Sequence, residues 1–135
     1  MAIDDNGLFQ SKYFGNADKY LIYEWKNNEM VYTGDADNPI KSVDEEQEFA
    51  MQKKGHAIAG LLKSKGVKVL VAKMFGKNIH IVKQNFIPVI IYIKESDEAV
   101  SVIKRHIKWI EDELNNSPAE YKLFHLKHGA LKMII

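Results

Sequence analysis

The segment Gly55–Gly76 constrains the fold of this chain more than any other part of the sequence. It holds a short amphipathic helical pattern that ends at Gly66, then a β-branched run, Val67–Ala72, and then a second glycine turn at Gly76. A helix followed by a buried strand is typical of sheets covered by helices. In such sheets ligands bind at the carboxyl ends of strands and beside helix N-termini. The segment therefore predicts both a scaffold and a binding site.

The rest of the chain predicts strands that alternate with helices. Residues 20–25 and 30–33 indicate a hairpin whose turn is Asn27-Asn28. This order predicts an α/β fold of three layers, in which one mixed sheet carries helices on both faces. The other predicted elements are a loop at 34–39, a helix from 43 to 65 that Gly55 can divide, a short helix at 76–85, a strand at 87–93, and one helix from the N-cap Ser96 to Leu114.

Residues 116–135 form a C-terminal extension of a domain that spans residues 1–115. Two apolar runs, Tyr121–Lys127 and Ala130–Ile135, flank His128-Gly129, and this pattern predicts a hairpin. The apolar end of the hairpin requires cover from the body of the protein or from a second subunit. The extension is therefore a candidate contact for a homo-oligomer.

The composition argues against several classes of function. With no cysteine among its 135 residues, the chain forms no disulfide and no cysteine-ligated zinc or iron–sulfur site of its own. A net charge of +1 argues against nucleic-acid binding, and no apolar run approaches the ~20 residues that span a bilayer. The acidic start, Asp4-Asp5, is unlike a signal peptide. We therefore expect a cytoplasmic protein that binds neither nucleic acid nor membrane.

Several short motifs follow one another along residues 1–110. They are Ser11-Lys12-Tyr13-Phe14-Gly15-Asn16-Ala17, Asn38-Pro39, Gly55-His56 with Gly66-Val67 and Gly76, and Ile87-Pro88-Val89. In order and spacing they resemble the dinitrogenase iron–molybdenum cofactor biosynthesis family. The resemblance implies a ribonuclease H-like α/β/α fold and a small non-enzymatic protein that carries iron–molybdenum cofactor or a related metal–sulfur cluster. It also implies partner proteins that donate and accept the cluster.

The best candidate ligand for such a cluster is His56. A neutral imidazole binds iron and other transition metals, and His56 stands where the helical pattern is expected to begin. Met74 offers a soft thioether, and Gly76 offers a turn whose backbone N–H groups can bind an anion. The alternatives are a histidine that only caps or packs a helix start, a methionine that fills space, and a structural turn.

Three further candidates lie in the first motif. Ser11 and Tyr13 can donate hydrogen bonds to an anionic cluster, beside a tight turn at Gly15. Tyr13 stands where the family commonly has a histidine, so one expected ligand is replaced. The family's first strand is also longer than the Met1–Ile3 that precedes the acidic turn here.

Two rival hypotheses remain open. Asp4, Asp5, Asp35 and Asp37 could hold magnesium for phosphodiester cleavage, although they lie in turn-forming sequences rather than in strands. No catalytic triad or phosphate-loop signature supports an enzyme. The second alternative is a metal-free interaction or regulatory module that acts through residues 116–135. Among the other histidines, His80 and His106 are expected to be solvated.

Overall fold

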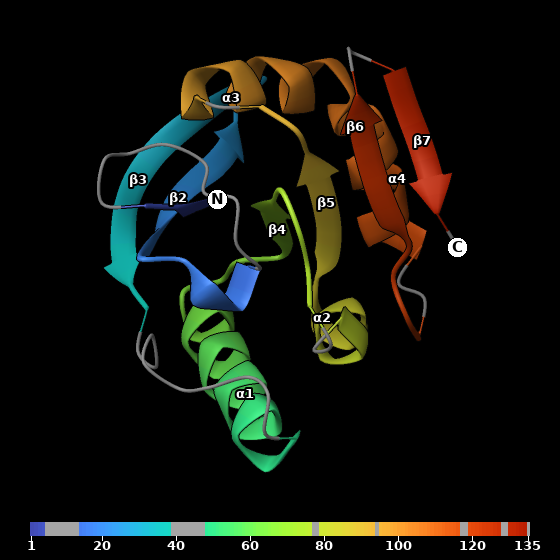
Figure 1. Ribbon diagram of the computed structural model, residues 1–135. Coiled ribbons are helices and arrows are strands. Elements are labelled where there is room, and N and C mark those ends of the chain that lie inside the picture. Colours follow the sequence, from blue (N-terminus) through green and yellow to red (C-terminus); the bar gives the residue numbers. More distant parts are fainter. Residues whose placement is uncertain are drawn as a thin grey trace.

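The computed structural model describes residues 1–4, 14–38, 48–76, 79–93, 95–116, 119–127 and 130–134. Helices and strands alternate from α1 to α3, so the α/β class is confirmed (Figure 1). In chain order the elements are β1 (Ala2–Ile3), the 3-10 turn η1 (Phe14–Asn16), β2 (Lys19–Lys26), β3 (Glu29–Asp37), α1 (Glu48–Ser64), β4 (Val69–Ala72), α2 (Ile79–Asn85), β5 (Ile87–Ile91), α3 (Ser96–Arg105), α4 (Ile107–Asn116), β6 (Leu123–Lys127) and β7 (Ala130–Ile134).

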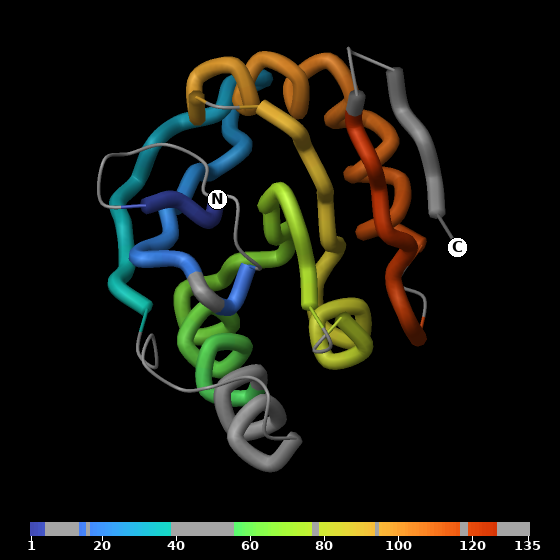
Figure 2. Tube along the Cα trace, viewed as in Figure 1, coloured from blue at the N-terminus to red at the C-terminus, as the bar shows by residue number. Residues whose placement is uncertain are grey.

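The described strands hydrogen-bond as two sheets, where the sequence predicts one mixed sheet. The first is antiparallel, in the order β1-β2-β3, and the second has the order β4-β5-β6-β7. Strands β4, β5 and β6 are parallel, and β7 is antiparallel to β6. Strand β1 pairs with β2 and also contacts β4, but no hydrogen-bonded ladder between β1 and β4 joins the two sheets in the described residues. Met1 lies between the two sheets, near the middle of the molecule (Figure 2).

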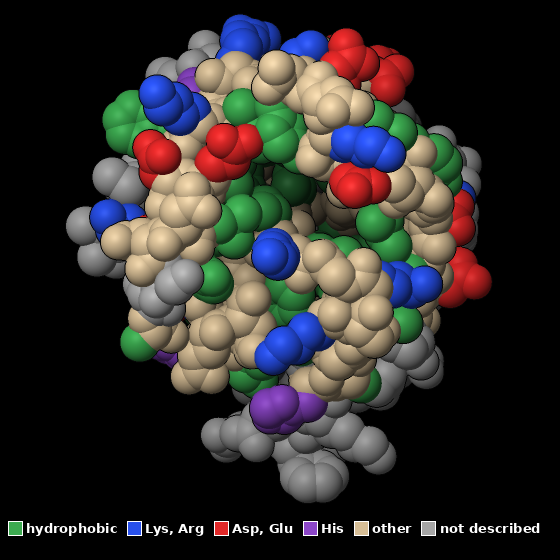
Figure 3. Space-filling model, turned by 180° about the vertical axis from the view of Figure 1, so that it is seen from behind, with side chains coloured by type: hydrophobic (Ala, Val, Ile, Leu, Met, Phe, Trp, Pro, Cys, Tyr) green, Lys and Arg blue, Asp and Glu red, His purple; other side chains and the backbone are tan. Residues whose placement is uncertain are grey.

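Helices lie on both faces of β4, as the sequence predicts, because alternate residues of this strand enter two different cores. Leu70 and Ala72 pack in a cluster with Ile58 and Leu62 of α1. Val71 packs in a second cluster with residues of α3, α4 and β5. The molecule is hollowed on the face turned away from the view of Figure 1 (Figure 3).

Two helices differ from their predicted form. Helix α1 continues through Gly55, so the glycine does not divide it. The predicted helix from Ser96 to Leu114 breaks at His106, and α3 and α4 lie on either side of the break. The prediction that His106 is solvated is wrong, because its ring is buried with Nδ1 2.9 Å from the carbonyl oxygen of Val102. The N-cap of α3 is Glu95 rather than Ser96.

Strand β3 continues to Asp37, so the predicted loop at 34–39 is wrong for its first four residues. Aspartate and glycine favour turns, but pairing with β2 overrides this local preference. The register shifts between Ile22 and Tyr23, and Gly34 adopts a φ of 155°, a conformation that favours glycine. The bulge places one extra residue in β3, and the pairing of β3 with β2 continues on both sides of it.

The C-terminal segment forms the predicted hairpin, and it is also part of the main sheet. Strand β6 pairs in parallel with β5, and Phe124 and Leu126 are buried in the core with Val89. The segment before β6 is joined to α2 by a hydrogen bond, in which the backbone N–H of Tyr121 donates to the carbonyl oxygen of Lys83 at 2.8 Å. Residues 119–127 are therefore integral to the fold. Within the described residues, no helix is long and apolar enough to cross a membrane.

Candidate functional site

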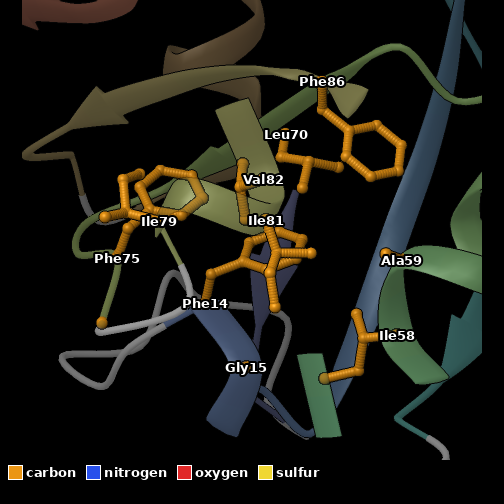
Figure 4. A pocket seen from close by; sticks show the side chains of 11 residues that line it. Phe14, Gly15, Ile58, Ala59, Leu70, Phe75, Ile79, Ile81, Val82 and Phe86 are labelled. Atoms are coloured by element: carbon orange, nitrogen blue, oxygen red, sulfur yellow. The ribbon is translucent and has the colours of Figure 1, made fainter. Parts of the chain in front are cut away.

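A small apolar cavity, the glycine pocket, lies where η1 meets the turn that follows β4. Its volume is about 30 Å³, and it includes both Gly15 and Gly76. The structure thus brings together two candidate residues that are far apart in the sequence. Side chains from η1, α1, β4 and α2 converge on it (Figure 4). The lining residues are Phe14, Gly15, Ile58, Ala59, Leu70, Phe75, Gly76, Ile79, Ile81, Val82 and Phe86.

Aromatic side chains and backbone hydrogen bonds join the two loops of the pocket. The N–H of Phe14 donates to the carbonyl oxygen of Met74 at 2.8 Å, and the ring of Phe14 stacks on Phe75 with centroids 5.4 Å apart. The hydroxyl of Tyr20 donates to the carbonyl oxygen of Phe14 at 2.9 Å. The loop that carries Gly15 is therefore fixed to the end of β4, where the sequence places a binding site.

Asn38 is a positioning residue that is not among the residues predicted for the site. Its side-chain amide donates to the carbonyl oxygens of Gly15 and Ala17, at 2.8 and 2.9 Å. The Asn38-Pro39 motif was the available signal, but a short motif in a loop does not reveal which distant backbone it contacts. These two hydrogen bonds connect the end of β3 to the turn at Gly15.

The expected position of His56 at a helix start is wrong. Helix α1 begins at Glu48, so His56 lies in its middle, where the backbone N–H groups are already used by the helix. The side chain is exposed and does not line the pocket. Ala59, three residues later, does line it, and residues three apart are neighbours on a helix surface. His56 therefore lies on the exposed surface of α1, about one helical turn from a residue that lines the pocket.

The remaining candidates are not gathered at the cavity. The side chain of Met74 does not line the pocket, and the residue is 37% exposed. Its carbonyl oxygen accepts the hydrogen bond from the N–H of Phe14. Ser11 and Tyr13 lie outside the described residues.

The interior of the glycine pocket does not fit a metal–sulfur cluster. A volume of about 30 Å³ has room for only about two water molecules. The lining side chains are apolar, and none offers an imidazole, carboxylate or thioether. Across the described residues, no group of three or more histidine, aspartate or glutamate side chains is placed to hold a metal ion. A cluster at this site would therefore bind outside the cavity, at the rim.

The other described polar candidates do not line the pocket. His80 is exposed on α2, with Nδ1 3.7 Å from Oε1 of Glu120. Asp35 and Asp37 are exposed on β3, and the hydroxyl of Tyr32 donates to Oδ2 of Asp35 at 3.3 Å. Asp5, from the magnesium hypothesis, lies outside the described residues.

Comparison with known proteins identifies the family. A family model described as dinitrogenase iron-molybdenum cofactor matches residues 1–108, a range that includes both loops of the glycine pocket and ends within α4. No curated protein and no solved structure matched the chain. The match covers most of the 135 residues and agrees with the motifs around Gly15, His56 and Gly76. The chain belongs to the dinitrogenase iron–molybdenum cofactor family.

Proposed function

We propose that this protein is a non-enzymatic cytoplasmic carrier, which binds an iron–molybdenum cluster or its precursor at the rim of the glycine pocket. Membership of a family associated with this cofactor supports the proposal most directly. The exposed imidazole of His56 beside the pocket provides a ligand of suitable chemistry. The cluster is then cargo, received from one protein and passed to another.

The available ligands favour weak attachment. The chain has no cysteine, so a thiolate bond of its own is absent. One imidazole, together with backbone N–H groups near Gly15 and Gly76, would hold an anionic cluster through a single coordinate bond and hydrogen bonds. Attachment of this kind is reversible, which suits transfer between a donor and an acceptor protein.

Substitution of His56 tests the proposal directly. In anaerobic titrations with isolated iron–molybdenum cofactor, followed by visible absorption and metal analysis, we expect His56→Ala to bind at least about tenfold more weakly, because an imidazole ligand is lost. His80→Ala is the matched control, because this histidine is also exposed on a helix but faces Glu120. It should bind like the parent. Circular dichroism confirms that both variants are folded.

The outcomes separate the carrier from the metal-free alternative. If the parent takes up cofactor but His56→Ala takes it up equally well, the proposed ligand is wrong. A parent protein that contains no metal and takes up no cofactor supports a metal-free interaction module. The C-terminal hairpin gives that module a structural basis, because β7 is the last strand in the order of its sheet.

A further inference from the structure

A basic surface patch lies where α3 and α4 meet. Helix α3 ends at Arg105 and α4 begins at Ile107, so the single residue His106 separates them. The two helices run in different directions and form a corner of the molecule (Figure 1). We name the patch at this corner the helix corner. It consists of Lys104, Arg105, Lys108 and Trp109, all of which are exposed.

The packing of the two helices fixes the direction in which these side chains point. The buried positions of α3, α4 and the residue between them recur at the spacing of a helix stripe that faces the core. They are Ala99, Val102, Ile103, His106, Ile110 and Glu113. Lys104, Arg105 and Lys108 occupy positions between them and face away from the core. The core therefore holds the helix corner outward.

Helix electrostatics accounts for only part of this patch. Lys104 and Arg105 lie in the last turn of α3, where cations interact favourably with the helix dipole. Lys108 lies in the first turn of α4, where a cation is unfavourable, and that turn contains no acidic residue. Within the part of the chain that the structure describes, none of the three cations forms an ion pair. The stability of the helices therefore does not explain Lys108.

The fourth residue of the helix corner gives it the composition of a protein-binding surface. Trp109 is 55% exposed, beside the three cations in the sequence. Tryptophan and arginine are enriched among the residues that dominate binding energy in protein–protein interfaces. Lysines around such residues increase the rate of association with an acidic partner and its specificity. The helix corner combines both kinds of residue.

Exposed carboxylates limit the helix corner on both sides. Asp97 and Glu98 lie about two helical turns before Lys104, and Asp112 lies about one turn after Lys108. A nucleic-acid backbone or an anionic membrane extends beyond a patch of this length and would come close to these carboxylates. Three cations are also fewer than the roughly six to ten phosphate contacts of a typical DNA-binding protein. The charges therefore favour a short acidic segment of protein.

We propose that the helix corner binds an acidic segment of a partner protein, in which carboxylates flank a large apolar side chain. The guanidinium of Arg105 can bind a carboxylate through two parallel hydrogen bonds, and the two lysines attract its neighbours. The apolar side chain packs on the indole of Trp109. This inference does not rest on the proposed binding of a cluster, because none of the four residues lines the glycine pocket.

A labelled peptide tests the inference without any metal. The probe is a capped fluorescent peptide in which glutamates flank one central leucine. In anisotropy titrations of the full chain at low salt, we expect saturable binding, at least about tenfold weaker when glutamine replaces every glutamate. A peptide with glycine in place of leucine should bind several-fold more weakly, because it loses the apolar contact. Binding of the first peptide should also weaken at least about tenfold in 1 M salt, which screens the charges.

Variants of the helix corner locate the binding site. Arg105→Ala and Trp109→Ala should each weaken binding of the acidic peptide at least about fivefold. Lys63→Ala is the matched control, because Lys63 is also an exposed residue in the last turn of a helix. It should leave the affinity unchanged. In NMR titrations, the indole N–H signal of Trp109 should shift with the added peptide. Thermal melts monitored by circular dichroism confirm that the variants fold.

Charge reversal provides an independent test. A variant that combines Lys104→Glu with Arg105→Glu should lose binding of the acidic peptide. It should gain binding of a peptide in which lysine replaces every glutamate.

Four results would overturn the inference. Equal binding of the glutamate and glutamine peptides would exclude charge pairing, and unchanged affinity in Arg105→Ala would place binding elsewhere. Tighter binding of single-stranded DNA, or of vesicles of phosphatidylserine and phosphatidylcholine, at the same salt concentration would show a different class of partner. A dimer of the parent protein that dissociates in Arg105→Ala would show that a second copy of this chain occupies the helix corner.

Discussion

At the scale of single residues, the buried side chain of Glu113 accepts a hydrogen bond from a backbone group outside its own helix. Glu113 is 6% exposed, and its Oε2 accepts a hydrogen bond from the backbone N–H of Lys122 at 3.0 Å. This contact joins α4 to the segment that leads into β6. A glutamate in an amphipathic helix is normally expected on the solvated side, so its sequence position does not reveal the contact.

Substitution of Glu113 should therefore lower the stability of the C-terminal segment. Glu113→Ala leaves the Lys122 N–H without its acceptor, and we expect a loss of about 2 kcal/mol in the free energy of unfolding. Glu113→Gln keeps a carbonyl oxygen as acceptor and should cost less than about 1 kcal/mol. Urea denaturation measures both, with exposed Asp112→Ala on the same helix as a near-neutral control. Equal losses for alanine and glutamine would contradict the role of the hydrogen bond.

At the scale of elements, the end of α1 shows how a local motif sets the chain direction. The N–H of Gly66 donates to the carbonyl oxygen of Lys63 at 3.0 Å, and the N–H of Val67 donates to that of Leu62 at 3.1 Å. These are the two bonds of a Schellman motif, and Gly66 has the left-handed φ of 75° that the motif requires. Leu62 and Val67 also meet in the same core cluster. The motif turns the chain from α1 into β4.

Two glycines of this region should respond oppositely to alanine. Gly66→Ala should lower the free energy of unfolding by about 1–2 kcal/mol, because alanine disfavours a positive φ. Gly60→Ala should raise it by about 0.5–1 kcal/mol, because Gly60 is exposed within α1. An added Cβ meets no atom within 4 Å at either position, so the difference isolates the backbone. Chemical denaturation that showed the same sign for both would refute this explanation.

At the scale of the whole molecule, the junction of the two sheets is built around Met1. Met1 is 9% exposed and its amine donates to the carbonyl oxygen of Leu21, and burial lowers the pKa of this amine from 8.0 to about 5. Ala2 and Ile3 belong to the same short strand and are also buried. The first residues thus contact both sheets.

The buried amine predicts a pH dependence for the 135-residue chain. Between about pH 5 and 8 the unfolded state binds a proton that the folded state does not, so stability falls as the pH is lowered. A shift from 8.0 to about 5 corresponds to a decrease of about 4 kcal/mol in the free energy of unfolding. The decrease is complete below pH 5, and there is none above pH 8. Urea denaturation across this range tests it, with intact mass confirming that Met1 is present. A variant extended before Met1 has no amine there and should lose this component; an identical pH profile would contradict it.

Much of the fold could be predicted from local pattern. The apolar run Val67–Ala72, the hairpin around Asn27-Asn28 and the apolar stripe of the helix after Ser96 all appear in the structure at nearly the predicted places. The candidate site was predicted less completely. Gly15 and Gly76 line one pocket, whereas His56 lies in mid-helix and Met74 does not line the pocket.

The sequence by itself determined the order of helices and strands and the family, because periodicity, glycine turns and motif spacing are local properties of the chain. Only the tertiary structure decided that the strands form two sheets, that His106 is buried, and that Asn38 holds the Gly15 turn. These features depend on contacts between residues far apart in the chain. Local patterns specify which face of an element is apolar, but packing selects the surface that covers it.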